Sequence, residues 1–179
     1  MQKLKNLFNR FIHKEEEWRN IEIVFGREFI SITTWISAGL TIRDLSYAPI
    51  VLNMNCTDSE FIHAIKLAFE RCTFVKVKER SVYCKQALEN TLQYDEFLKK
   101  EEMSLIQQFE YKTRKELHRD QKTLSVSYNS VEYQFIPCQT KSDGFVGIET
   151  ISLPMQVSDQ ELLRKVREMM GLCTSIYKI

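Results

Sequence analysis

The amino-acid sequence predicts one α+β domain made of two pseudo-symmetric units, each with about four antiparallel strands and one helix, and a helical insertion between them. Two observations predict this architecture. One segment of the chain is repeated later without a gap, and each copy changes from alternating apolar residues to apolar residues at helical spacing.

Composition supports a single folded domain over residues 1–179. Hydrophobic residues make up 44% of the chain and charged residues 27%, which is ordinary for a globular protein. The sequence has 5 glycines and 3 prolines and no low-complexity tract, so disorder is not expected.

The repeat aligns residues 50–73 with residues 151–174. Seven of the 24 aligned positions are identical, whereas roughly one or two identities are expected from composition. The identical pairs are Ile50 and Ile151, Leu52 and Leu153, Met54 and Met155, Asp58 and Asp159, Glu60 and Glu161, Cys72 and Cys173, and Thr73 and Thr174. A common strand-to-helix junction without duplication is the alternative explanation.

Each copy is expected to be a strand followed by a capped helix. The alternating apolar residues 50, 52 and 54 would place one face inward, as would residues 151, 153 and 155. Thr57 and Ser158 are then helix N-caps, and Glu60 and Glu161 stand where a capping box needs a carboxylate.

Upstream of each copy, two strands about a turn predict a hairpin. These strands cover residues 21–25 and 29–34 in the first unit, and residues 124–128 and 131–136 in the second. Short strands at 40–42 and 145–148 complete a first repeat over 21–73 and a second over 124–175.

Two segments lie outside the repeats. Residues 1–20 are expected to form an N-terminal amphipathic helix, because the apolar residues are spaced along residues 4–12 and do not form the continuous block of a signal peptide. Residues 74–123 form the insertion, with helices expected at 81–92 and 94–119, preceded by a basic strand containing Lys76, Lys78 and Arg80.

Charge and cysteine content narrow the function classes. A net charge of +1 argues against a strongly basic nucleic-acid binder, and no apolar stretch is long enough to cross a membrane. Five cysteines without a CxxC pair fit reduced thiols, so a cytoplasmic protein is expected, without a metal site. No cofactor-binding or catalytic motif occurs, and we expect no enzymatic activity and no cofactor.

Few residues are candidates for chemistry. His63 aligns with Arg164, which indicates a solvent-facing position, and Glu116 with His118 fits a charged helix surface better than an acid–base pair. The densest acidic groups are Glu15 to Glu17 and a helical group that could enter the basic groove of a nuclease. The helical group comprises Asp95, Glu96, Glu101 and Glu102.

Two stretches, residues 48–72 and 130–175, resemble the CdiI group of bacterial immunity proteins of contact-dependent growth inhibition. Both contain a strand, a Ser/Thr-Asp-x-Glu cap and a helix that ends near a small residue. The resemblance implies a protein that binds and neutralises a cognate toxin C-terminal domain, often a nuclease, by covering its active site.

The doubled unit is also similar to the Whirly architecture, in which two antiparallel sheets pack crosswise. Whirly proteins bind single-stranded nucleic acid, and that is the alternative function. The lysine-rich loop typical of those proteins is not apparent in this sequence, and the oligomeric state is not predicted.

Overall fold

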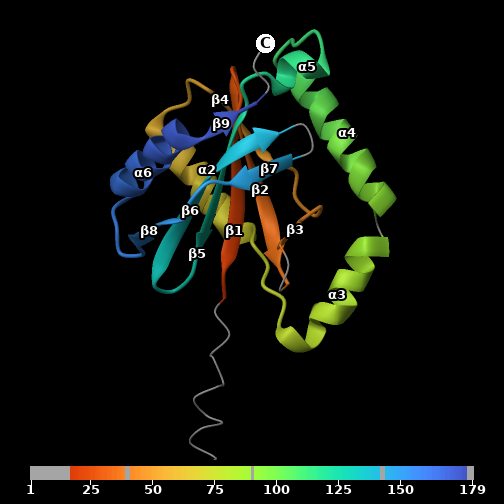
Figure 1. The fold of residues 1–179 in the computed structure, drawn as a ribbon, viewed down its shortest axis with the longest axis vertical. Helices are drawn as coiled ribbons and strands as arrows, with labels where there is room; N and C mark the ends of the chain where they lie inside the picture. Colours follow the sequence, from red (N-terminus) through yellow and green to blue (C-terminus); the bar gives the residue numbers. More distant parts are fainter. Residues whose placement is uncertain (1–16, 39–40, 90, 142–143, 177–179) are drawn as a thin grey trace, which may run out of the picture.

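The computed structural model describes residues 17–38, 41–89, 91–141 and 144–176, and it confirms an α+β fold. A curled, mostly antiparallel sheet forms the centre of the molecule. Helices α2 and α6 lie on one side of this sheet, and α3, α4 and α5 form an arc on the other side (Figure 1).

Nine strands form the sheet, in the order β3-β2-β1-β5-β6-β7 along its main path. Strand β4 pairs with β2, and β8 and β9 both pair with β6. The strands are β1 (Arg19–Phe25), β2 (Phe29–Ser37), β3 (Thr41–Arg43), β4 (Ile50–Asn53), β5 (Lys122–Tyr128), β6 (Glu132–Lys141), β7 (Gly144–Gly147), β8 (Ile151–Pro154) and β9 (Thr174–Ser175).

The two halves of the chain make the same strand connections. Strand β2 pairs with β1, β3 and β4, and β6 pairs with β5, β7 and β8. Strands β1 and β5, the first of each half, join the halves by antiparallel pairing that places Ile23 opposite Leu124.

Corresponding backbone hydrogen bonds recur in the two halves. The amide of Met54 donates to the Glu28 carbonyl, and that of Met155 donates to the Val131 carbonyl, both at 2.9 Å. The end of β2 also accepts from the Val75 amide, as the end of β6 accepts from the Ile176 amide.

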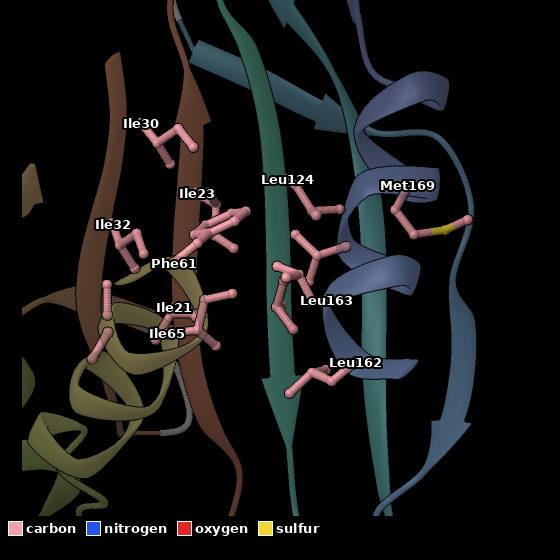
Figure 2. Packing of buried hydrophobic residues seen from close by; sticks show 14 of the residues in the cluster. Ile21, Ile23, Ile30, Ile32, Phe61, Ile65, Leu124, Leu162, Leu163 and Met169 are labelled. Atoms are coloured by element: carbon pink, nitrogen blue, oxygen red, sulfur yellow. The ribbon is translucent and has the colours of Figure 1, made fainter. Parts of the chain in front are cut away.

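The apolar core lies between the sheet and the helices α2 (Asp58–Arg71) and α6 (Asp159–Leu172). Alternate residues of β1, namely Ile21, Ile23 and Phe25, point toward these helices, because side chains alternate between the two faces of a strand. Figure 2 shows Phe61 and Ile65 of α2 and Leu163 of α6 packed against Ile23 and Leu124.

Both predicted N-caps are present. Thr57 and Glu60 form a complete capping box, whereas Ser158 accepts a hydrogen bond from the Glu161 amide at 3.2 Å. The two helices are also joined by reciprocal ion pairs, Lys66 with Asp159 and Arg167 with Asp58, which link equivalent positions of the repeat.

Three helices occupy the segment between α2 and β5. They are α3 (Val77–Glu89), α4 (Thr91–Gln108) and α5 (Arg114–His118). The basic strand expected around Lys78 is wrong, because Lys78 and Arg80 belong to α3. The chain forms one parallel bridge to β2, at Phe74, and then turns into the helix.

The expected N-terminal helix of residues 1–20 falls mostly outside the described residues. Its last two residues, Arg19 and Asn20, are in β1, paired with Tyr128 and Ser127 of β5. Residues 17 and 18 precede this strand without regular structure.

Candidate functional site

The second face of the sheet, under α4, is polar near its centre. Glu22 of β1 lies opposite Thr33 of β2 and Ser125 of β5, so these three residues share the face that points away from α2 and α6. At one end of this face, Phe29, Tyr111 and Leu117 form a small apolar cluster with the last turns of α4. This cluster anchors α4 and α5 over the sheet.

Between the sheet and α4 lies a cavity of about 180 Å³, hereafter the α4 cavity. The sheet provides Glu22, Val24, Phe29, Ser31, Thr33 and Arg43, and the helices and the turn after them provide Leu98, Glu101, Glu102, Leu105, Leu117, His118 and Gln121.

One wall of the cavity is an ion pair between Arg43 of β3 and Glu101 of α4. Their side chains are 11% and 17% exposed, and the Arg43 guanidinium also lies 5.5 Å from the ring centre of Phe97. Burial raises the pKa of Glu101 despite the attraction of Arg43. The pair therefore fixes the middle of α4 to the edge of the sheet.

Glu22 lies at the base of the cavity. Its Oε2 atom is buried and has no hydrogen-bond partner among the described residues. Burial raises the pKa of Glu22 to about 7, against the attraction of Arg43 and with a contribution from the negative charge of Glu101. Two further buried atoms lack partners within the described chain, Nε of Arg43 and Oε1 of Glu101.

A second polar group closes the other end of the cavity. Glu102 accepts from His118 Nε2 at 2.8 Å and from Arg114 at 2.5 Å, and His118 Nδ1 lies 3.0 Å from Gln121 Oε1. Burial alone would raise the pKa of Glu102, but the hydrogen bonds and charges of Arg114 and His118 lower it. Glu102 is thus a paired carboxylate.

The structure divides the four acidic residues predicted from the sequence into two pairs. Asp95 and Glu96 are exposed near the start of α4, and no ion pair joins either to another described residue. Glu101 and Glu102 point inward and are bound to Arg43, His118 and Arg114.

Glu22 and Arg43 were not singled out by sequence reasoning. Glu22 alternates with Ile21 and Ile23, a pattern that equally fits a strand with one hydrated face. Its partial burial in the folded protein comes from tertiary packing under α4.

His63 and Glu17 do not line the α4 cavity. His63 is exposed on α2, as its alignment with Arg164 indicated. Cys72 and Cys173 are buried helix C-caps, and burial raises the pKa of both thiols, that of Cys72 to about 11. Glu15 and Glu16 lie outside the described residues, and Glu17 is exposed.

Within the described chain, no group of three or more potential ligands is placed to hold a metal ion. None of its helices combines the length and the apolar character that crossing a membrane requires.

A family model for CDI immunity proteins, CdiI, matches residues 19–173. The chain belongs to the CdiI family. The match spans both halves of the fold and the three helices between them, so the family assignment extends beyond the two stretches that carried the resemblance.

Solved structures with a similar fold include the following two. One is a protein of unknown function from Neisseria meningitidis, 15% identical, with a TM-score of 0.76 over 88% of this chain and 96% of the other. The other is a chain of a CdiA-CT/CdiI toxin and immunity complex from Yersinia pseudotuberculosis, 17% identical, with a TM-score of 0.66 over 88% and 98%. None of the curated proteins matches the chain significantly.

Proposed function

We propose that this protein binds the C-terminal toxin domain of its own contact-dependent growth inhibition system and neutralises it without any turnover. The family match over residues 19–173 carries this proposal. A complex of a toxin with its immunity protein is also among the structures that share the fold, which is consistent with a protein toxin as partner.

The toxin is proposed to be a nuclease with a basic groove. Asp95 and Glu96 provide exposed negative charge on α4, where it can attract a groove that binds phosphate groups. Glu101 and Glu102 are part of the same proposed interface, but their ion pairs within the chain give them the additional role of holding α4 in place.

The polar side chains at the junction of α4 and α5 are bound to one another within the chain. Both ring nitrogens of His118 are engaged, one with Glu102 and one with Gln121. His118 thus links α4 to the turn before β5 through Glu102 and Gln121.

We also propose that the two halves are copies of one ancestral unit, in a Whirly-like arrangement. The recurring strand connections, N-caps and ion pairs support this origin. The single-strand nucleic-acid function that the Whirly likeness suggested gains no support, because Lys78 and Arg80 belong to a helix and form no basic sheet face.

The test is co-expression of this chain with the toxin domain encoded beside it. We expect survival of the host cells, a one-to-one complex on size-exclusion chromatography with light scattering, and loss of the toxin's nuclease activity in vitro. Cell death despite normal levels of folded protein would contradict the proposal.

Charge reversal tests the α4 contribution. Asp95→Lys and Glu96→Lys should each slow association with a basic toxin and reduce its salt dependence. Glu70→Lys is the matched control, because Glu70 is an exposed acid on α2, on the other side of the sheet. Equal effects of all three substitutions would indicate net charge and not an α4 interface.

A further inference from the structure

Glu22 is a charged residue placed at the base of the α4 cavity without a cation of its own. Arg43, the buried cation beside it, forms its ion pair with Glu101, and the Oε2 atom of Glu22 has no partner in the described chain. A buried carboxylate oxygen without a hydrogen bond is costly, and the attraction of Arg43 offsets only part of the desolvation of Glu22. The fold keeps this residue where an apolar side chain would be more stable.

The unpartnered atoms define the chemistry that would fit. Two are carboxylate oxygens, Glu22 Oε2 and Glu101 Oε1, and one is a donor, Arg43 Nε. Acceptors thus outnumber donors, and once Glu22 is ionised the side chains of Glu22, Arg43 and Glu101 carry a net negative charge. A group with several N–H donors and a positive charge complements these atoms, and the planar fork of a guanidinium matches carboxylates particularly well.

The volume of the α4 cavity fits the head group of one side chain and is too small for a larger ligand. The cavity measures about 180 Å³, whereas pockets for drug-sized molecules begin near 300 Å³. One water occupies about 30 Å³ of liquid, so the space holds a few waters or one head group with one or two waters. No three potential ligands of the described chain are grouped to hold a metal ion.

The position of the cavity relates it to the proposed interface. Leu98, Glu101 and Leu105 of α4 line it. The exposed acids Asp95 and Glu96 lie about one and a half turns before Glu101 on the same helix. A basic partner attracted to the start of α4 would therefore bring its cationic side chains to the cavity.

We propose that the α4 cavity is a specificity pocket that accepts one arginine or lysine side chain of the toxin domain, with Glu22 as its anion. This inference rests on the proposed function for the source of the cation. The geometry of the pocket itself is a property of this chain alone and can be tested without the toxin.

The first experiment uses n-propylguanidinium as a probe of the full-length protein, followed by ¹H–¹⁵N NMR. We expect saturable shifts of amides on β1, β3 and α4, and at least a fivefold weaker affinity for Glu22→Gln. Glu70→Gln is the control and should bind the probe like the parent protein. Unsaturable shifts, or equal affinity for Glu22→Gln, would show that the cavity holds only water and would overturn the proposal.

The pH dependence gives a second readout. A cation favours the ionised form of Glu22, so probe binding should release a proton and tighten up to about tenfold between pH 6 and pH 8. The groups that face Glu22 are Arg43 from β3, Tyr94, Glu101 and Glu102 from α4, His118 from α5 and Cys138 from β6. Glu22→Gln retains all of them and should lose most of the pH dependence.

The second experiment measures the toxin domain by calorimetry against the same variants. We expect Glu22→Gln to weaken the complex at least tenfold and Glu70→Gln to leave its affinity unchanged. One Arg→Ala or Lys→Ala substitution in the toxin should cause no further loss of affinity when it is combined with Glu22→Gln. Equal toxin affinity for the parent and Glu22→Gln would overturn the inference and leave the immunity function intact. Probe binding without toxin binding would instead contradict the immunity function and retain the cation pocket.

Discussion

The two faces of the central sheet are built from the same strands but are stabilised differently. Under α2 and α6, β1 contributes Ile21, Ile23 and Phe25 to a closely packed apolar core. Under α4, the residue between the two isoleucines is Glu22, which lines a cavity together with Arg43 and Glu101. One buried side-chain atom of each of these three residues lacks a hydrogen-bond partner in the described chain. One face thus provides most of the folding energy, while the other retains charged groups at a cost in stability.

We infer from this difference that the polar face serves a function, because its charged residues lower the stability of the fold. Apolar residues of similar volume often stabilise a protein more than a buried ion pair does. Buried polar groups without a hydrogen-bond partner are rare in native structures. Residues that break this rule together, in one cavity, are the best place to look for a binding site.

The largest expected effect is on the apolar face. Phe61→Ala should lower the free energy of unfolding by about 3–5 kcal/mol, because Phe61 is 2% exposed and packs edge-to-face on Phe25. Urea denaturation measures the loss. Phe145→Ala, at a residue 42% exposed on β7, is the control and should change stability by about 0.5 kcal/mol or less. Similar losses for both would place the main core elsewhere.

On the polar face, the substitution Glu22→Gln should raise the free energy of unfolding, whereas Phe61→Ala lowers it, and the gain should depend on pH. The folded-state pKa of Glu22 is raised, so stability from this residue is full below about pH 4.5 and is lost as the pH rises to about 7 and above. Glu22→Gln should remove that loss and stabilise the protein at pH 8, by up to about 3 kcal/mol. Denaturation series at pH 5 and pH 8 test this, and a parent protein with the same pH profile as Glu22→Gln would contradict it.

The N-caps of α2 and α6 allow the same interaction to be compared in the two halves of the chain. Thr57→Ala and Ser158→Ala should each cost about 1 kcal/mol, and Thr57→Ala should cost more, because only Thr57 belongs to a complete capping box. Ser59 is exposed and lies two residues after Thr57 in the first turn of α2, and Ser59→Ala should be nearly neutral. Chemical denaturation that ranks Ser158→Ala above Thr57→Ala would rule out the box as the source of the difference.

The smallest effect should come from the ion pairs between α2 and α6. Lys66 with Asp159, and Asp58 with Arg167, are about half exposed, so each pair should contribute at most about 0.5 kcal/mol. A double-mutant cycle on Lys66 and Asp159 at low and high salt measures the coupling energy. A coupling that does not fall with salt would show that these residues interact by packing and not by charge.

The sequence by itself determined the elements that depend on local patterns. The alternation around Ile50 and Ile151, the Ser/Thr-Asp-x-Glu caps and the helical spacing after them predicted β4, β8, α2 and α6, because each signal acts within a few residues. The hairpins and the α+β class followed from the same patterns.

Tertiary structure alone decided the candidate site. Glu22 and Glu101 are 79 positions apart, and whether either is buried depends on where α4 packs, which no local pattern specifies. The four acids of α4 look alike in sequence, yet two are exposed and two are paired inward, because the small cluster around Phe29 and Leu117 fixes the rotation of the helix over the sheet. The charge of a residue is written in the sequence, but its solvation and its partners, which set its pKa and its role, arise only when distant segments pack together.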